Sequence, residues 1–119
     1  MRPLRWARRI VAAAPDLVEC GDPYVPAHAA LHAAEALGIP AVAFCHSDLV
    51  RFAESRYGAP GRAAAAAYLR ALYDRFDCVI APSRHMASRL DALGVRVVLT
   101  RPLGVDTDVF NPARGNGVV

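Results

Sequence analysis

The chain has 119 residues, of which 55% are hydrophobic and 21% are charged, and its formal net charge is +3. This composition is typical of a globular protein and excludes an intrinsically disordered chain. The length fits one domain, and no apolar run approaches the about 20 residues that a membrane-spanning helix needs.

The positive charge comes entirely from arginine, because the sequence contains no lysine. The arginines are scattered and no aromatic residues alternate with them, which argues against a nucleic-acid-binding protein. The arginine-rich start lacks the apolar centre of a signal peptide and is predicted to form an amphipathic helix. Peripheral contact of this helix with an anionic membrane stays open. Three cysteines without CxxC spacing favour a cytoplasmic protein, either in solution or at the inner face of the membrane.

Hydrophobic periodicity predicts helices and strands in strict alternation. Pro15 and Gly38 are suited to end helices, Ser83 to begin one, and Gly94 to end it. In chain order, the predicted elements are a helix over residues 4–14, a strand over 17–20, a helix over 25–37, a strand over 41–45, a helix after 61, a strand over 78–81, a helix after 83 and a strand over 95–99.

Short apolar strands that alternate with helices imply parallel strands joined by right-handed crossovers. The run 41–45 is apolar throughout, as expected for a strand that is covered on both faces. The sequence therefore predicts an α/β fold with an open parallel sheet of about four strands. The tail, residues 113–119, is expected to be frayed.

Polar residues follow each predicted strand at its carboxyl end, which is where an open parallel sheet binds ligands. In chain order they are Asp22; His46, Ser47 and Asp48; Ser83 and Arg84; and Arg101, Gly104 and Asp106. We expect these groups to converge on one edge of the sheet. The alternative for any one of them is that strand ends are polar simply because they reach the surface.

Four segments resemble, in order and spacing, the family 4 glycosyltransferases, which have the GT-B architecture. They are DLVE at residues 16–19, GIP at 38–40, DCVIAPS at 77–83 and GVDTDVFNP at 104–112. The resemblance covers residues 15–112. The segment 38–58 is most similar to the mannosyltransferase-like members.

The resemblance implies that the chain is part of a two-domain enzyme. Residues 1–103 would be part of the amino-terminal, acceptor-side Rossmann-like domain, and residues 104–119 would begin the interdomain linker. Gly104, Val105 and Asp106 would form the interdomain hinge, with the glycine serving the turn and the hinge and Asp106 fixing the turn. The carboxy-terminal donor domain is missing from the sequence, so we expect the chain to be inactive alone.

The activity that the resemblance implies is transfer of a sugar, with mannose as a candidate, from a nucleotide-sugar donor to a sugar, lipid or glycan acceptor. The anomeric configuration would be retained and no metal would be needed. A complete enzyme would use a GDP- or UDP-sugar, whereas this chain alone is expected to bind no cofactor. Stabilisation of the leaving diphosphate, usually the largest part of such catalysis, would fall to the missing domain.

The resemblance also suggests site residues. His46 falls where the family has a histidine or another polar group facing the reaction centre, so it is the candidate catalytic residue. The candidate acceptor-binding residues are Asp48, Ser83, Arg84 and Arg101. Asp48 would hold an acceptor hydroxyl, and Ser83, at a helix start, suits an anionic or hydroxylated group. The two arginines would help to neutralise phosphate.

Two other groups of residues suggest a metal site and a nucleophile, but their positions in the sequence do not support either. His28 and His32 are four residues apart on a predicted helix and could share a zinc ion, but no third ligand has suitable spacing. Cys45 and His46 suggest a nucleophile and its base, but neighbours on a strand point to opposite faces.

The rival function is a free-standing, non-catalytic α/β module that binds a ligand or a partner protein. Such a module should not leave strand 17–20 as an exposed apolar edge.

Overall fold

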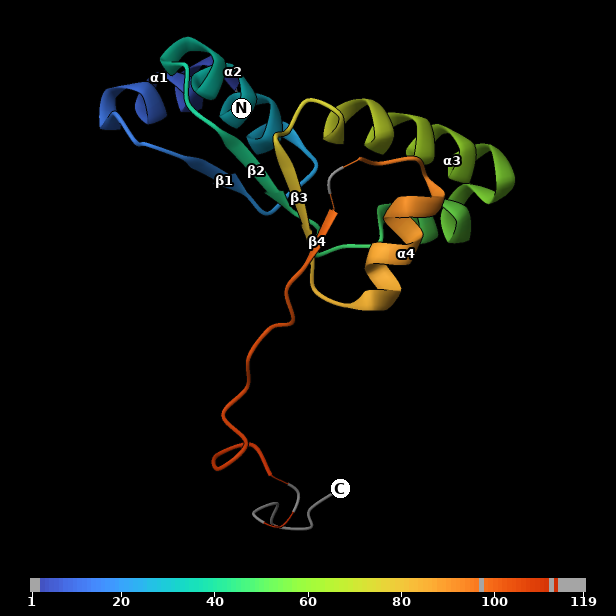
Figure 1. Cartoon of the computed structure of the whole chain (residues 1–119). Helices are drawn as coiled ribbons and strands as arrows, with labels where there is room; N and C mark the ends of the chain where they lie inside the picture. Colours follow the sequence, from blue (N-terminus) through green and yellow to red (C-terminus); the bar gives the residue numbers. More distant parts are fainter. Residues whose placement is uncertain (1–2, 97, 112, 114–119) are drawn as a thin grey trace.

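The computed structural model describes residues 3–96, 98–111 and 113 (Figure 1). In this part of the chain, four helices alternate with four strands, as predicted. The elements are α1 (Pro3–Ala13), β1 (Val18–Cys20), α2 (Val25–Leu37), β2 (Ala41–Phe44), α3 (Leu49–Tyr73), β3 (Cys78–Ala81), α4 (Arg84–Ala92) and β4 (Val98–Thr100). The predicted frayed tail lies outside the described residues except for residue 113.

The strands form one parallel sheet in the order β1-β2-β3-β4. Each strand lies beside the next one in the chain, so right-handed crossovers bring α2, α3 and α4 to the same face of the sheet. Figure 1 shows the helices gathered on one side of the strands. The structure therefore confirms the predicted α/β fold with an open parallel sheet. It also leaves β1 at one edge of the sheet among the described residues.

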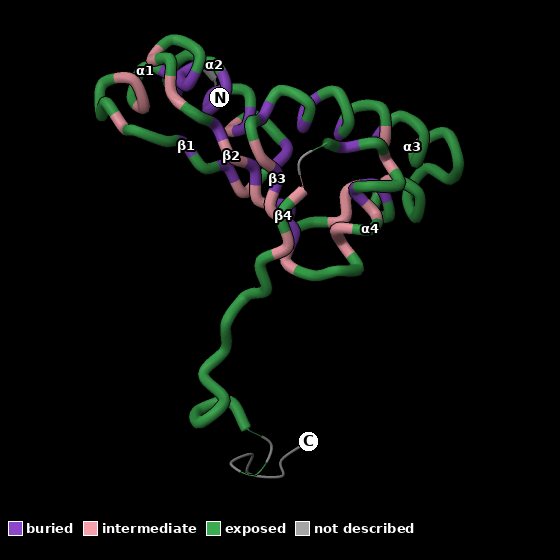
Figure 2. The backbone as a smooth tube through the Cα atoms, in the orientation of Figure 1, coloured by how far each residue is buried: buried purple, intermediate pink, exposed green. Residues whose placement is uncertain are grey.

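The helix-covered face of the sheet forms the core. Ala43 and Val79 are buried there together with Leu31 of α2, Leu69 of α3 and Leu90 of α4. Figure 2 shows burial concentrated in the strands and on the facing sides of the helices, whereas the chain after β4 is exposed. The periodic apolar positions of the helices thus meet alternate residues of the strands, as an α/β layer requires.

The opposite face of the sheet carries no helix in the described part of the chain. Val42, Phe44, Cys78 and Ile80 lie on this face and are only half-buried, and Leu99 is 46% exposed. The prediction that β2 is covered on both faces is therefore wrong for the described residues. The physical reason is the strand order, since every crossover joins neighbouring strands and stays on one side.

The long helix α3 begins at Leu49, earlier than predicted. Asp48 caps it by accepting a 3.0 Å hydrogen bond from a backbone N–H of the first turn. A kink at Gly58 (φ 65°, ψ −155°) divides the helix, in a conformation that favours glycine. Beyond the kink, an added Cβ on Gly61 would lie 2.6 Å from the carbonyl oxygen of Ala53. The two halves of α3 therefore approach too closely for a side chain at that position.

The last strand begins later than predicted. Val95 belongs to the turn that ends α4, because its N–H donates a 3.1 Å hydrogen bond to the carbonyl of Leu90. Gly94 has φ 77° in this turn, as predicted for a residue that ends a helix. Across the described residues, no helix combines the length and the apolar character needed to cross a membrane.

Candidate functional site

The carboxyl ends of the strands lie at one edge of the sheet, because all the strands are parallel. Pairing continues past the end of β2, where Cys45 N donates to the carbonyl of Ile80 at 2.8 Å. It also continues past β4, where Arg101 N donates to the carbonyl of Ala81 at 2.9 Å. The backbone thus brings the polar segments after β2, β3 and β4 to one edge, but their side chains divide into two groups.

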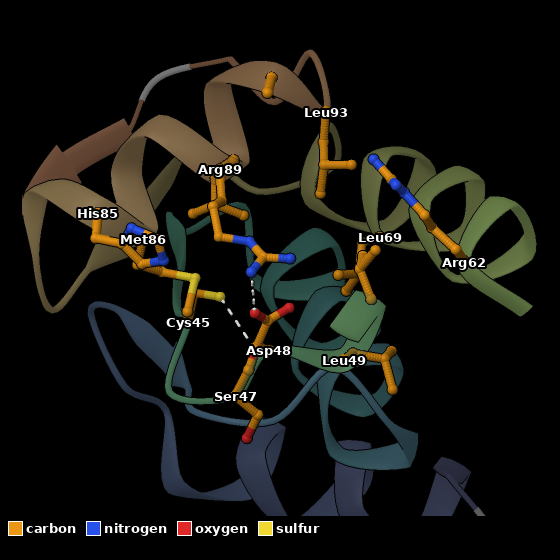
Figure 3. Close-up of a pocket in the computed structure, with 13 residues that line it drawn as sticks. Cys45, Ser47, Asp48, Leu49, Arg62, Leu69, His85, Met86, Arg89 and Leu93 are labelled. Carbon is orange, nitrogen blue, oxygen red and sulfur yellow. Dashed lines mark hydrogen bonds and ion pairs between the residues drawn. The ribbon is translucent and has the colours of Figure 1, made fainter. Parts of the chain in front are cut away.

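The first group surrounds a cavity of about 330 Å³ beyond the end of β2, between α3 and α4 (Figure 3). Most of the lining is apolar, with leucine side chains from both helices and Met86 from α4. The hydroxyl, carboxylate and basic side chains of the lining come from Ser47, Asp48, Arg62, His85 and Arg89. A cavity with apolar walls and a few converging polar groups is the usual form of a small-molecule site.

Asp48 is the one candidate acceptor-binding residue that lines this cavity, next to Ser47 of the same strand end. Both carboxylate oxygens of Asp48 have partners. Oδ2 lies 2.7 Å from Nη1 of Arg89, and Oδ1 accepts the hydrogen bond from Arg51 N that caps α3. Figure 3 shows the Arg89 guanidinium directed at the carboxylate across the cavity. The ion pair is partly buried, with side chains 25% and 33% exposed. Asp48 therefore stabilises the start of α3 and holds a fixed carboxylate at the cavity wall.

Three other predicted residues are not in the lining of the cavity. Ser83 Oγ accepts a 3.1 Å hydrogen bond from Met86 N and so caps α4, which confirms the predicted N-cap. Arg84 is the exposed first residue of α4. Arg101 is also exposed, and its Nη1 donates to the carbonyl of Thr100 at 3.0 Å. These groups are reachable from solvent at the ends of β3 and β4.

His46 belongs to the second group, on the other side of the sheet edge. Its ring stacks on Phe44 with a centroid separation of 4.2 Å and an interplanar angle of 14°. Gly21, just after β1, approaches the same ring, since an added Cβ there would lie 3.2 Å from His46 Cδ2. Cys45 points into the core, so strand alternation sends His46 the opposite way. His46 and Asp48 therefore face different spaces at the same edge.

Cys45 is a core residue, as the sequence suggested. Its side chain is buried and its Sγ contacts the carbonyl of Ser47 at 3.6 Å. Burial raises the pKa of the Cys45 thiol, and the charge of Asp48 raises it further, against the opposing effect of a hydrogen bond with Tyr73. A raised pKa leaves little of the nucleophilic thiolate. Geometry and protonation both disfavour the nucleophile interpretation.

The histidine pair on α2 shows a different arrangement from a zinc site. His28 Nε2 lies 3.2 Å from the hydroxyl of Tyr68 on α3, which also donates to the carbonyl of Pro23. Within residues 3–96, 98–111 and 113, no group of three or more His, Cys, Asp or Glu side chains is placed to hold a metal ion. The described contacts of His28 are those of a structural residue between two helices.

The linker segment contains a local turn at Asp106. Asp106 Oδ1 accepts hydrogen bonds from Asp108 N at 2.9 Å and from Val109 N at 3.1 Å, and its carbonyl accepts from Phe110 N at 2.8 Å. Gly104 is not among the glycines with positive φ, and an added Cβ there would meet nothing within 4 Å. Asp106 therefore fixes this local turn, as expected, and Gly104 adopts no left-handed conformation beside it.

Arg62, His85 and Arg89 line the cavity but were not predicted from the sequence. Each is a polar residue in a helix, where the sequence alone predicts a solvated position, and no local signal links Arg89 to Asp48. Their role depends on how α3 and α4 pack against each other. The Asp48 cap, by contrast, could have been found from an aspartate before an apolar helical run.

Replacing Asp48 with alanine is expected to lower the free energy of unfolding by about 0.5–2 kcal/mol, because α3 loses its cap. Asp48→Asn should retain most of this stability, since the amide oxygen can still accept the hydrogen bond. Urea unfolding followed by circular dichroism measures both effects. Asp91→Ala, on the exposed side of α4, is the matched control. Equal losses for the alanine and asparagine variants would show that the cap is not the cause.

The Glycosyltransferase Family 4 model matches residues 1–109. A GDP-mannose-dependent alpha-mannosyltransferase of Mycobacterium tuberculosis is 37% identical over 116 residues, which are 97% of this chain and 30% of that protein. A protein with the same name from Mycolicibacterium smegmatis is 36% identical over 99 residues, 83% of this chain and 26% of the relative.

A third relative of that name, from Corynebacterium glutamicum, is 28% identical over 100 residues, 84% of this chain and 24% of the relative. The chain thus spans less than a third of the length of the curated relatives that it matches. No solved structure matches it significantly.

Proposed function

The chain belongs to glycosyltransferase family 4, and we propose that it forms the acceptor-side part of an enzyme that transfers a sugar from a nucleotide-sugar donor. The names of the three relatives support GDP-mannose as the donor of the complete enzyme and mannose as the transferred sugar. The observation that carries the proposal is the carboxyl edge of the parallel sheet. There, an exposed histidine and a cavity with a fixed carboxylate lie at the end of the same strand.

In this proposal, residues 1–103 form the acceptor-side unit and residues 104–119 begin the connection to a donor-binding domain. The sheet supports this division, because β4 ends at Thr100. Residues 101–111 are all exposed, and their turn is held by local hydrogen bonds to Asp106. The half-exposed apolar face of the sheet also fits a unit that other parts of a larger protein cover.

His46 is the proposed catalytic residue of the complete enzyme. Its ring is exposed, and stacking on Phe44 fixes the ring plane. An imidazole held in this way can hydrogen-bond a sugar hydroxyl or the group being transferred. Transfer with retained configuration would also need groups that stabilise the leaving diphosphate, and we assign those to the donor-binding domain.

The cavity beside Asp48 is the proposed acceptor site. The Asp48 carboxylate, which Arg89 holds in position, can receive a hydrogen bond from a hydroxyl group of the sugar acceptor. Ser83, Arg84 and Arg101 lie at the ends of the neighbouring strands, where they can contact further hydroxyl or phosphate oxygens. The apolar walls suit the carbon skeleton of a sugar, lipid or glycan acceptor.

The separation of acceptor and donor functions is tested with the 119-residue chain by itself. With GDP-mannose and a panel of other GDP- and UDP-sugars, the chain is expected to release no nucleoside diphosphate, because the donor-binding groups lie outside it. A coupled assay for the diphosphate, with a complete family member as the positive control, makes the measurement. Release by the purified chain above the blank would overturn this part of the proposal.

A further inference from the structure

The imidazole at the end of β2 lies over a position of the neighbouring strand that has no side chain. We propose that Gly21, the residue that follows β1, is a positioning residue for His46, because the side chain that it lacks leaves the space in which the imidazole stacks on Phe44. The inference rests on the proposed function, since it concerns the residue proposed there as catalytic. The place of the ring can nevertheless be measured apart from the reaction.

Side-chain alternation places Gly21 on the same face of the sheet as His46. Glu19 is the exposed residue between two buried ones in β1, so the position two residues later also belongs to the open face. Phe44 and His46 face this side from the end of β2, since Cys45 between them is buried. A side chain at position 21 would therefore extend over the open face, where the imidazole lies.

The pairing of β1 with β2 sets Gly21 next to the stacked rings. Cys20 pairs with Ala43, so the same register continued by one residue sets Gly21 beside Phe44. His46, two residues farther along, is then the diagonal neighbour of Gly21 on this face. The distances agree, because an added Cβ at position 21 would lie 3.2 Å from Cδ2 and 3.4 Å from Nε2 of His46.

A tight turn returns the imidazole to this place. The N–H of His46 donates a 3.1 Å hydrogen bond to the carbonyl of Phe44, so the chain bends at Cys45. The bend is anchored to β3 by the 2.8 Å hydrogen bond from Cys45 N to the carbonyl of Ile80. The imidazole thus has one face on Phe44, with 4.2 Å between the ring centroids, and one edge beside Gly21.

A methyl group at position 21 would displace the ring. Carbon atoms in favourable contact are about 3.5–4.0 Å apart, so at 3.2 Å the imidazole must move by a few tenths of an ångström. Gly21 is not among the glycines with positive φ, and alanine can therefore adopt its backbone conformation. The contact with His46 is then the main structural effect of Gly21→Ala.

Proton NMR of the 119-residue chain reports the place of the ring. Stacking on Phe44 should move the imidazole proton signals of His46 upfield through the ring current, and His46→Gln assigns these signals among the four histidines. In Gly21→Ala they are expected to move downfield. The matched control is Gly104→Ala, because an added Cβ at that glycine would meet nothing within 4 Å. It should leave the His46 signals unchanged.

Stability provides a second measurement of the same contact. In a His46→Ala background, Gly21→Ala should stabilise the chain, because alanine restricts the unfolded state and no ring is present to be displaced. With His46 present, the same substitution should stabilise less or destabilise. Urea unfolding of the two single variants and the double variant measures this coupling. If Gly21→Ala alone did not fold, the double variant should fold.

The consequence for the reaction is measured in a hybrid enzyme, in which the chain replaces the matching segment of the Mycobacterium tuberculosis relative. Gly21→Ala is expected to lower kcat by roughly 10- to 100-fold, since misplacing a reacting group by about 1 Å can cost about a hundredfold. In the His46→Ala hybrid, Gly21→Ala should lower kcat no further. This non-additivity separates positioning of His46 from a general loss of structure.

Two results would overturn the proposal. One is a set of His46 signals that Gly21→Ala leaves unchanged. The other is a loss of kcat from Gly21→Ala that is equally large with and without the imidazole. A hybrid whose kcat is the same after His46→Ala would instead overturn the catalytic role of His46, and the NMR signals would still decide whether Gly21 positions the ring.

Discussion

Replacing His46 with alanine in an active hybrid enzyme is expected to lower kcat by a factor of about 10²–10⁴, the usual contribution of a positioned acid–base group. In this hybrid, the chain replaces the matching segment of the Mycobacterium tuberculosis relative, which is 37% identical over 116 residues. The loss is expected because alanine cannot donate or accept a hydrogen bond at the end of β2. Without the imidazole that stacks on Phe44, no polar side chain would remain at this position.

Two further variants make the His46 result specific. His46→Gln retains hydrogen bonding but not proton transfer, so it separates these two roles of the imidazole. His32→Ala is the matched control, because His32 is an exposed histidine on α2, away from the strand ends. It should leave kcat unchanged. If the His46→Ala hybrid turned over as fast as the unaltered hybrid, His46 would have no catalytic role.

Replacing Leu90 with alanine is expected to lower the free energy of unfolding by about 2–5 kcal/mol, the range for leucine removed from a packed core. Leu90 is 1% exposed and belongs to the cluster that joins α4 to the sheet, where Val79 is 0% exposed. The loss would be a large part of the about 5–15 kcal/mol that stabilises a typical domain. The cavity beside Asp48 would also lose one of its walls.

Leu103→Ala is the matched control for Leu90, because the same atoms are removed from a side chain that is 65% exposed. It should change the free energy of unfolding by less than about 0.5 kcal/mol. Urea unfolding followed by circular dichroism measures both variants. A Leu90→Ala variant as stable as this control would contradict the packing of α4 against the sheet.

Most of the fold could be predicted from the sequence because its signals are local. The apolar run of β3, the glycines at 38 and 94, and the serine cap of α4 each act within a few residues. The first half of α3 was not predicted, since Gly58 and Pro60 interrupt its pattern. Its start depends on the Asp48 cap, which the strand-end interpretation had assigned to ligand binding alone.

The exposed face of the sheet could not be predicted from periodicity. The residues of β2 are apolar on both sides, and that pattern is the same whether one face or two are covered. Only the order of the strands decides that the helices lie on one side. Strand order is a property of the whole chain, and no single segment encodes it.

The candidate site could be predicted only as far as the sheet edge. Parallel strands place their ends together, so the polar segments after them were found. The separation of His46 from the cavity follows from side-chain alternation beyond β2. The ion pair between Asp48 and Arg89 follows from the packing of two helices. Alternation is a local rule, but the face on which the cavity lies and the partner of Asp48 depend on tertiary packing, which motif spacing does not contain.

Sugar transfer by the hybrid enzyme tests the central claim most directly. With GDP-mannose and an acceptor that the Mycobacterium tuberculosis relative uses, the hybrid is expected to form the same mannosylated product and to release GDP. Deleting the inserted segment should abolish the reaction while GDP-mannose binding remains. A folded hybrid that binds GDP-mannose but transfers no mannose, under conditions in which the unaltered relative does, would contradict the account.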